Sequence, residues 1–511
     1  MFVKAFASTI VGIKAVTITV EVHLTGGIGM YLVGLPDNAV KESGERIRAA
    51  FENSGYRMTG RKTTVNLAPA DLRKEGSAYD LPIALAILAA SGQISDEKLG
   101  DYMILGELSL DGSVKAIRGA LPSAIQAAAE GFKGIIVPEP NAPEAAVVDG
   151  LKVYGVQTLK QVAEFLNGGE ELTPAIPDGG EAAALAGRYD EDFSDVRGQA
   201  HVKRALEIAA AGGHNVIMIG APGSGKTMLA RRMPTIMPPM TLAEALEVTK
   251  IHSVAGKLGR ESGLMTRRPF RTPHHLTSQV ALIGGGQNPQ PGEISLAHNG
   301  ILYADEFAEF GRGLLEVLRQ PLEDRKITVS RARYSVEYPA NFILIASMNP
   351  CPCGYYNHPT KECTCAPGAV ARYMNRISGP LMDRIDMHIQ VTPVDFAEMN
   401  AAPAAEPSAA VRARVVAARE RQQHRFDGLE GVHTNAMMNP KMIRSHARPS
   451  ADGAALLERA MKRYDLSARA YDRILKVART IADLAGSAEI ESAHIAEAIH
   501  YRSLDKAGWG L

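Results

Sequence analysis

A glycine-rich turn in the stretch "NVIMIGAPGSGKTMLARRM" has the composition of a phosphate-binding loop. Gly220, Gly225, Lys226 and Thr227 stand in the spacing G-x-x-x-x-G-K-T, between a predicted strand and a predicted helix. Glycines there let backbone N–H groups converge on phosphate oxygens without Cβ clashes. We expect Lys226 to reach the β- and γ-phosphates of ATP and Thr227 to ligate Mg²⁺. The residues expected to bind the nucleotide are Gly220, Ala221, Pro222, Gly223, Ser224, Gly225, Lys226, Thr227, Met228 and Asp305.

Two acids follow a second apolar run, in "NGILYADEF". Asp305 can hold Mg²⁺ together with the phosphate-loop threonine, and Glu306 can polarise the water that attacks the γ-phosphate. Alone, such a pair is typical of a solvated strand end, but with a phosphate loop it indicates a nucleoside-triphosphatase. A third apolar run precedes Asn349, whose amide can orient the attacking water. The alternative is that Asn349 opens the turn at Pro350.

All four cysteines lie within "CPCGYYNHPTKECTC", just after Asn349. Their spacing is C-x-C-x₉-C-x-C, and four thiolates suit a structural, tetrahedral Zn²⁺ site with no open position. The spacing is tighter than in most zinc sites, and His358 between the pairs can replace one thiolate. The alternative is a set of reduced, unliganded cysteines in a polar loop. The expected ligands are Cys351, Cys353, Cys363 and Cys365.

The rest of the sequence arranges these motifs in an α/β protein with three domains. Residues 1–168 alternate strand-like runs such as "AVTITVEVHL" with helical patterns such as "NAVKESGERIRAAFENSG" and "ALPSAIQAAAEGF". Residues 169–192 are rich in Gly, Pro, Ala and acids and predict a linker. The chemical motifs fall within 193–395, where apolar strands alternate with helices. Residues 396–511 are almost wholly helical in pattern.

Composition excludes several classes of protein. Lys+Arg and Asp+Glu both total 56, so contact with nucleic acid requires a local basic patch. No apolar run approaches the ~18 residues of a membrane span, and the N-terminus lacks a signal-peptide pattern. We therefore expect a cytoplasmic protein without a membrane partner, whose cysteines are reduced rather than disulfide-bonded.

Longer stretches resemble one known family. "FRTPHHLTSQVALIGGG", "PQPGEISLAHNGILYADEF", "LRQPLED" and "NPCPCG" are similar to motifs of the YifB/ComM branch of the Mg-chelatase-like AAA+ ATPases, and the likeness covers nearly the whole chain. "YADEFAEF" departs from that pattern, which has Leu before the Asp and Pro after the acids. The resemblance implies a Lon-protease-like N-terminal α/β domain, a central P-loop AAA+ αβα core and a C-terminal helical lid.

The resemblance also implies roles for residues outside the phosphate loop. Asn349 matches the first sensor, and Arg384 in "GPLMDRIDMHIQV" matches the arginine finger. Arg469 in "SARAYDRILKVAR" matches the second sensor, with Arg473 as its rival. A finger supplied to a neighbour completes the site only between subunits, so the resemblance implies a homo-oligomeric ring, a hexamer. Surface ion pairs are the alternative for either arginine.

The N-terminal domain is expected to be a scaffold without protease activity. Its stretches "RKEGSAYDLPIALAILAASGQI" and "ILGELSLDGSVKAIRGALPSAIQAAAEGF" resemble the Lon-type protease domain, which needs a serine activated by a lysine. Ungapped matching places Ala78 at the position of the serine and Leu121 at that of the lysine. Ser77 lies one position before the place of the serine, and Lys115 is the lysine nearest to the place of the lysine.

For the work of the ATPase, the resemblance implies DNA remodelling: ComM-like branch migration or helicase activity in recombination of incoming DNA. Arginines in "RRM", "MTRRPFRTPHH" and "SRARY" are candidates for phosphate contacts. The alternatives are a chaperone-type ATPase that remodels protein and, less favoured, a Mg-chelatase-type motor. His274, His275 and His298 lack an obvious ligand set, so we expect hydrogen-bonding or loop roles, with substrate contact as the alternative.

Overall fold

The computed structural model describes residues 1–169, 171–176, 189–259, 263–286, 289–331, 334–393, 405–429 and 431–502. The chain forms two compact units. The first comprises Met1–Leu185 together with Leu242–Thr266, and the second comprises Ala186–Thr241 together with Arg267–Leu511. The segment predicted as a linker lies partly outside the described residues. Among the described residues, no helix combines the length and the apolar character needed to cross a bilayer.

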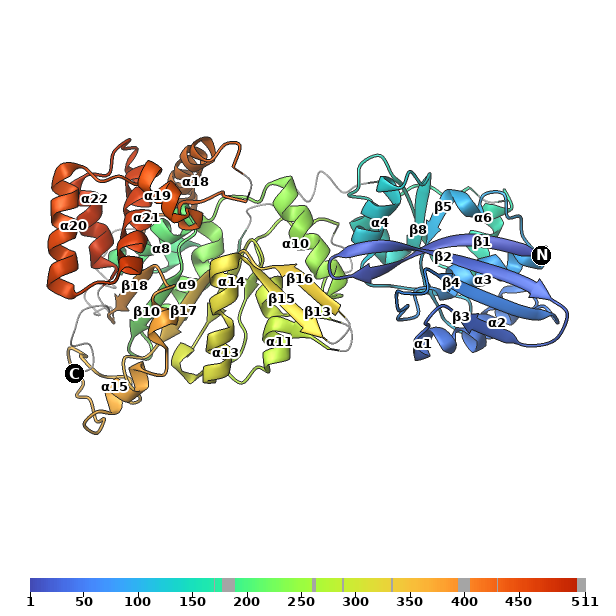
Figure 1. Cartoon of the computed structure of the whole chain (residues 1–511), viewed down its shortest axis with the longest axis horizontal. Helices are drawn as coiled ribbons and strands as arrows, with labels where there is room; N and C mark the ends of the chain where they lie inside the picture. Colours follow the sequence, from blue (N-terminus) through green and yellow to red (C-terminus); the bar gives the residue numbers. More distant parts are fainter. Residues whose placement is uncertain are drawn as a thin grey trace. The chain divides into compact units, whose positions relative to one another are not determined.

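A seven-stranded mixed sheet forms the frame of the first unit. Its two longest strands, β1 and β2, make an antiparallel hairpin (Figure 1). Within the hairpin Phe2 lies opposite His23, and Val11 lies opposite Lys14. The strands in order across the sheet are β3 (Met30–Val33), β4 (Lys62–Ala68), β2 (Lys14–Thr25), β1 (Phe2–Val11), β5 (Tyr102–Ile104), β8 (Gly134–Pro138) and β9 (Lys152–Val156). A separate pair is formed by β6 (Glu107–Leu108) and β7 (Val114–Lys115).

Helix α3 (Asp80–Ala90) fills the core of this unit. Every one of its residues is buried, because its sequence "DLPIALAILAA" is apolar on nearly all sides. It packs against β1 and β2. The helix predicted from residue 38 is divided at Glu42 into two helices. The other helices of this unit are α1 (Asn38–Lys41), α2 (Ser43–Ser54), α4 (Ala120–Ala129), α5 (Ala142–Ala145), α6 (Leu159–Leu166) and α10 (Leu242–Val254).

Helix α10 belongs to the first unit although ATPase elements flank it in the sequence. It packs against α4, and the Gly119 amide donates a hydrogen bond of 3.2 Å to the Ser253 carbonyl oxygen. Burial raises the pKa of Glu144, whose carboxylate accepts a hydrogen bond from the side chain of Asn141 at 2.7 Å. Residues 242–266 therefore belong to the first unit, although the stretches before and after them in the sequence belong to the second unit.

A five-stranded parallel sheet forms the centre of the second unit. Strands β10 and β17 lie inside it and are buried along their whole length, as their apolar sequences require. The carboxyl ends of all five strands meet at one edge, where ligands bind in open α/β sheets. In order across the sheet the strands are β11 (Phe270–Arg271), β14 (Ile301–Ala304), β17 (Ile343–Met348), β10 (Val216–Gly220) and β18 (Met387–Val391).

Helices and two hairpins complete the second unit. The C-terminal helix α21 packs on α8 and α18, and α18 also packs on α9 (Figure 1). The structure is thus mixed α/β with a parallel core and a helical C-terminal part, and the predicted fold class is confirmed. The helices are α8 (Ala200–Gly212), α9 (Lys226–Ile236), α11 (Gln279–Ile283), α12 (Glu293–Leu296), α13 (Arg312–Val317), α14 (Arg319–Asp324), α15 (Ala369–Met374), α16 (Gly379–Met382), α18 (Ser408–Arg425), α19 (Pro440–His446), α20 (Ala451–Tyr464), α21 (Ala468–Ala485) and α22 (Ser492–His500). The hairpins pair β12 (Gly284–Gly285) with β13 (Gln290–Pro291) and β15 (Lys326–Arg331) with β16 (Tyr334–Pro339).

Candidate nucleotide-binding site

The phosphate loop joins strand β10 to helix α9 at the carboxyl edge of the parallel sheet. Gly223 and Gly225 have φ angles of +77° and +86°, in the left-handed region that favours glycine. A Cβ on Gly220 would collide with the carbonyl oxygen of Val391 in the neighbouring strand β18. The two φ angles and the close approach at Gly220 therefore favour glycine at these three positions.

Lys226 and Gln199 hold the loop from its two ends. The Lys226 ammonium donates hydrogen bonds to the carbonyl oxygens of Gly220 (2.7 Å) and Ala221 (3.0 Å). Burial lowers the pKa of Lys226, and the nearby Asp305 carboxylate opposes this shift. Gln199, in the loop before α8, donates from Nε2 to the Ser224 carbonyl oxygen at 2.7 Å. Sequence analysis missed Gln199, because nothing local connects it to a loop 25 residues away.

Thr227 and Asp305 meet where α9 begins and β14 ends. The Thr227 hydroxyl donates to Asp305 Oδ2 at 3.2 Å and lies 2.9 Å from the Tyr303 hydroxyl. The Tyr303 hydroxyl in turn lies 2.9 Å from Ser347 Oγ, and Ser347 donates a short hydrogen bond to Asp305. Burial raises the pKa of Tyr303 to about 12, so its hydroxyl stays protonated. The hydroxyl groups of Thr227, Tyr303 and Ser347 thus form a closed hydrogen-bond network with the Asp305 carboxylate.

Glu306 has a different partner from Asp305. Its backbone lies in the left-handed region with φ +52°, and its carboxylate oxygen Oε2 lies 3.0 Å from His275 Nδ1. The Glu306 side chain is 55% exposed and that of His275 is 24% exposed. The two adjacent acids therefore face separate sets of groups. Sequence analysis singled out His275 but gave it no partner.

Asn349 directly follows β17, and β17 lies between β10 and β14 in the sheet. Since the strands are parallel, Asn349 emerges at the same edge as the phosphate loop and the acid pair. Its side chain is half-buried. The predicted first sensor is thus placed between the two halves of the site by strand order alone.

The three candidate arginines differ in their surroundings. The Arg384 side chain is 12% exposed; its guanidinium lies 2.7 Å from Glu323 Oε1 and donates to the Pro380 carbonyl oxygen at 2.6 Å. Arg469 is 63% exposed, with Asp383 at 3.7 Å. Arg473 lies 3.0 Å from the fully buried carboxylate of Asp386. Of the two sensor candidates, Arg469 therefore has the accessible guanidinium, and Arg473 is held in an internal ion pair.

The four cysteines gather into one cluster. Sγ–Sγ distances are 3.3 Å for Cys351–Cys353, 3.5 Å for Cys353–Cys363 and 3.8 Å for Cys351–Cys363. All four sulfur atoms, including that of Cys365, lie within 4.8 Å of one another. A tetrahedral site with Zn–S bonds of ~2.3 Å has sulfur atoms ~3.8 Å apart. The cluster therefore has the dimensions of a four-thiolate metal site.

Hydrogen bonds within the cluster lower the pKa of one thiol, Cys353, and raise those of Cys363 and Cys365. Burial acts to raise the pKa of Cys353, but hydrogen bonds from the Tyr355 amide and from Cys351 outweigh it and lower this pKa to about 6. The Tyr356 amide donates to Cys351 Sγ at 3.3 Å. His358 is not a member of the cluster, and its Nδ1 accepts from the Thr360 amide at 3.2 Å. The hypothesis that His358 replaces a thiolate thus finds no support in this geometry.

In the first unit, Ser77 donates a short hydrogen bond to the Glu107 carboxylate. Leu121, at the position expected for a lysine, is buried at the start of α4. Lys74, the nearest lysine before Ser77, is buried and donates to the Leu72 carbonyl oxygen at 2.8 Å. Ser77 is therefore bonded to a carboxylate, and no lysine amine is recorded beside it among the described residues.

Comparison with known proteins agrees with the geometry of the second unit. Residues 192–399 match the family described as magnesium chelatase, subunit ChlI, and residues 405–502 match its C-terminal family. Residues 20–141 match the family described as subunit ChlI of Mg-chelatase. Competence protein ComM of Haemophilus influenzae is 44% identical over 96% of both chains, and YifB of Escherichia coli is 44% identical over 97% of this chain and 96% of its own. The chain belongs to the YifB/ComM family.

YifB/ComM membership confirms the Mg-chelatase-like AAA+ core and the helical C-terminal domain, and it indicates ATPase activity with ATP and Mg²⁺. The similarity to a magnesium-chelatase subunit covers a smaller share of the chain. The 67 kDa magnesium-chelatase subunit of Heliobacterium mobile is 30% identical over 32% of this chain and 28% of its own. Full-length similarity is therefore seen with ComM and YifB, whereas the chelatase subunit shares one part of the chain.

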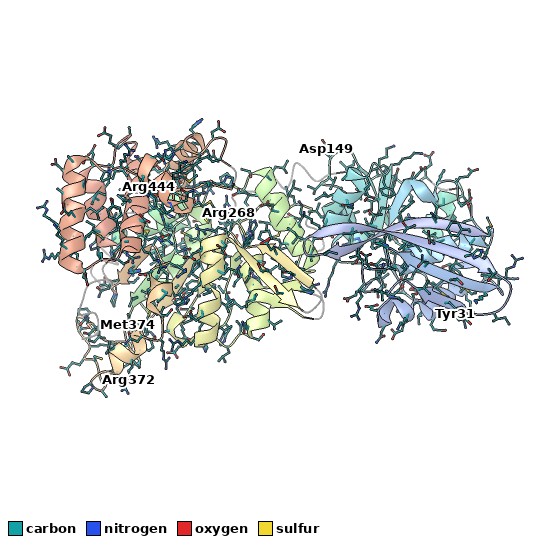
Figure 2. The ribbon with its side chains drawn as sticks, in the orientation of Figure 1. Tyr31, Asp149, Arg268, Arg372, Met374 and Arg444 are labelled. Carbon is teal, nitrogen blue, oxygen red and sulfur yellow. The ribbon has the colours of Figure 1, made fainter. Side chains whose placement is uncertain are left out.

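In this YifB/ComM family member, several arginines expected to contact DNA are used inside the subunit. Arg268, which is labelled in Figure 2, is buried. It donates to the carbonyl oxygens of Pro238 and Asn299, each at 2.7 Å. Arg271 pairs with Glu293 at 2.6 Å. Arg232 of "RRM" pairs with Asp195 at 2.8 Å and its side chain is 12% exposed. This expectation is corrected for the buried Arg268, whereas it stays a prediction for Arg271 and Arg232. Arg331 and Arg333 of "SRARY" lie outside the described side chains.

Proposed function

We propose that this YifB/ComM family member is a cytoplasmic ATP-driven motor that remodels DNA as a hexameric ring of identical subunits. The observation that carries the ATPase half of this proposal is the 3.2 Å contact between Thr227 of the phosphate loop and Asp305 at the end of β14. The full-length similarity to a protein named competence protein ComM supports the DNA half, as branch migration or helicase action on incoming DNA.

Thr227 and Asp305 fit a Mg²⁺ site. Adjacent oxygen ligands of octahedral Mg²⁺ lie ~3 Å apart when the Mg–O distance is ~2.1 Å. The 3.2 Å between Thr227 Oγ1 and Asp305 Oδ2 is close to this spacing. The Tyr303 hydroxyl is hydrogen-bonded to Thr227 Oγ1, and Ser347 orients the Asp305 carboxylate by donating to its other oxygen, Oδ1. In this proposal a bound Mg²⁺ neutralises charge on the phosphates of ATP.

The protein's own groups supply binding and orientation. Lys226 exchanges its bonds to loop carbonyls for phosphate oxygens, and the backbone amides of the loop and of the α9 N-terminus hold the phosphates. Glu306 polarises the attacking water, and Asn349 orients it. Arg384 reaches the site of a neighbouring subunit after release from Glu323, and Arg469 contacts the nucleotide from α21.

We also propose that the cysteine cluster binds one structural Zn²⁺. Its four sulfur atoms lie close to the ~3.8 Å edge of a zinc–thiolate tetrahedron. Elemental analysis of purified protein should find about one zinc per chain. Cys351→Ser should lower the zinc content strongly, whereas His358→Ala should retain it, because His358 lies outside the cluster. Purified protein without zinc that hydrolyses ATP at the full rate contradicts the proposal.

The test of the main proposal is ATP turnover by the full chain, with and without single-stranded, duplex and four-way-junction DNA. We expect a rate that rises with DNA, falls with salt and vanishes in Glu306→Gln. Glu309→Gln is the matched control, since Glu309 pairs with Arg376 at 2.6 Å and has no role in the proposed chemistry.

A DNA-indifferent ATPase would contradict the DNA half of the proposal. Stimulation by an unfolded protein would then favour protein remodelling of the chaperone type. Mg²⁺ insertion into a tetrapyrrole would favour the chelatase alternative. ATP turnover that survives Glu306→Gln would contradict the assignment of Glu306.

A further inference from the structure

One face of the sheet in the first unit carries a row of rings. Strands β3, β4, β2 and β1 are consecutive neighbours in this sheet (Figure 1). Their register places Tyr31 opposite Thr64, Thr64 opposite His23, and His23 opposite Phe2. Side chains of residues that lie opposite each other project from the same face of a sheet. The three rings and the threonine therefore form one line across four strands.

This line lies on an exposed part of the face. Phe2 is 54% exposed, and His23 is also exposed. Tyr31, which is labelled in Figure 2, is 52% exposed. Farther along β1 the same face is covered by α4, because Ser8 Oγ donates to Ser123 Oγ at 2.8 Å. The rings are thus accessible on a face that a helix covers elsewhere.

A cation lies over the ring at each end of the row. The Lys62 ammonium is 4.9 Å from the centroid of the Tyr31 ring, and the Lys4 ammonium is 5.6 Å from the centroid of the Phe2 ring. Lys4 also pairs with Glu21 at 3.5 Å, whereas Lys62 makes no ion pair among the residues that the structure describes. The two lysines and the one glutamate leave a net positive charge beside the rings.

Exposed rings flanked by cations bind single-stranded nucleic acid in many proteins. Bases stack on the rings, and cationic side chains contact the phosphates between the bases. In a duplex the faces of the bases are covered by the neighbouring base pairs, so a row of rings cannot stack on them. The chemistry of this face therefore favours a single strand over a duplex.

We propose that this face of the first unit binds single-stranded DNA, with bases stacked on Tyr31, His23 and Phe2 and phosphates beside Lys62 and Lys4. Binding is independent of base sequence, because every base has a π-face. The inference rests on the DNA half of the proposed function. It adds a DNA site in the unit that does not contain the phosphate loop.

The first test is the Kd of the full chain for a fluorescently labelled oligothymidine strand, measured by anisotropy. In Tyr31→Ala we expect the Kd to rise about tenfold, the effect of losing one stacked base, while the Kd for duplex DNA stays the same. Tyr31→Phe keeps the ring and should bind as wild type. Val33→Ala is the matched control, since Val33 is exposed on the same strand and face but has no ring. Equal melting temperatures verify that the variants are folded.

The second test is the salt dependence of strand binding. Lys62→Ala removes one phosphate contact and should lower the slope of log Kd against log salt concentration by about 0.7. Lys160→Ala is the control, because Lys160 is an exposed lysine of the same unit that pairs with Glu164 on α6. An unchanged slope in Lys62→Ala would contradict the contact assigned to Lys62.

Cross-linking locates the strand directly. A strand that contains 5-iodouracil, irradiated in complex with the wild-type chain, should cross-link to Tyr31, His23 or Phe2. Cross-links confined to the second unit, or an unchanged Kd in Tyr31→Ala, overturn the inference and leave the proposed function standing. A Tyr31→Ala protein that sediments differently but binds the strand normally also overturns it, and identifies the face as an interface between copies of the chain. If the wild-type chain binds neither single-stranded nor duplex DNA, the DNA half of the proposed function fails and the inference fails with it.

Discussion

Gly354 of the cysteine loop lies against Pro222 of the phosphate loop: a Cβ on Gly354 would come within 2.7 Å of Pro222 Cδ. Gly354 has φ +85°, and its amide donates to the Cys351 carbonyl oxygen at 3.0 Å. The turn that carries the first cysteine pair therefore also supports the backbone that is proposed to hold phosphate. A change in the shape of the cysteine loop is transmitted to the nucleotide site by direct packing.

This packing predicts that Gly354→Ala weakens ATP binding. The added methyl group must displace Pro222, because 2.7 Å is closer than carbon atoms approach. We expect the Kd for ATP to rise about tenfold, measured with a fluorescent ATP analogue. Gly368→Ala is the matched control, since Gly368 has a similar φ of +76° but open space around its Cβ position. Equal effects of the two substitutions would attribute the loss to backbone strain alone.

The two sensor candidates should separate into a stability role and a catalytic role. Burial disfavours the Asp386 carboxylate, but Arg473 and then His214 outweigh it and hold the pKa of Asp386 well below its usual range. Arg473→Leu leaves this buried charge without its main partner and should lower the free energy of unfolding by about 3 kcal/mol.

Arg469→Leu should change the free energy of unfolding by less than about 0.5 kcal/mol, because Arg469 is 63% exposed, and should lower ATP turnover. Urea unfolding and ATPase assays on both variants decide the assignment. A stable Arg473→Leu protein that has lost turnover would identify Arg473 as the sensor.

Stability should fall as the pH drops below about 6.5. Burial and the positive charge of Arg502 hold the pKa of His388 well below its ordinary value. Below about pH 6.5 the unfolded chain binds a proton at this residue that the folded chain does not, so the free energy of unfolding decreases by up to ~1.4 kcal/mol per pH unit. Urea unfolding at about pH 7.5, 6.5 and 5.5 should show this slope. His388→Gln should make it shallower, while His424→Gln, at an exposed site on α18, should not.

The first unit should not cleave protein. A serine needs a base to become a nucleophile, and Ser77 is bonded to the Glu107 carboxylate rather than to a lysine. Incubation of the purified protein with casein should give no fragments, with or without ATP. Casein cleavage by the unaltered protein that is lost in Ser77→Ala would contradict this prediction, because it would show that a base activates Ser77.

Sequence analysis predicted the parts of the site that depend on short, continuous segments of the chain. The phosphate loop and the acid pair depend on glycine spacing and on flanking apolar runs, which are local properties. Sequence analysis did not identify Tyr303 and Ser347, because a single hydroxyl residue inside an apolar run does not form a recognisable motif. Their hydrogen-bonded link to Thr227 forms only when two strands and a helix come together in the fold. The predicted contact of Arg268 with DNA was wrong for the same reason. The sequence shows that the residue is charged, but it does not show the carbonyl oxygens of Pro238 and Asn299 that accept its hydrogen bonds in the fold.

Helix α10 has a further consequence for how the polypeptide is made. The first unit takes this helix from a stretch that follows the phosphate loop in the sequence, so the chain passes between the two units three times. On the ribosome, the N-terminal unit cannot finish folding until the start of the ATPase has already been synthesised. A fragment that ends before residue 242 would lack one of its own helices, and an ATPase fragment would carry that helix without α4 to cover it. Neither unit is therefore encoded by one continuous stretch of the chain.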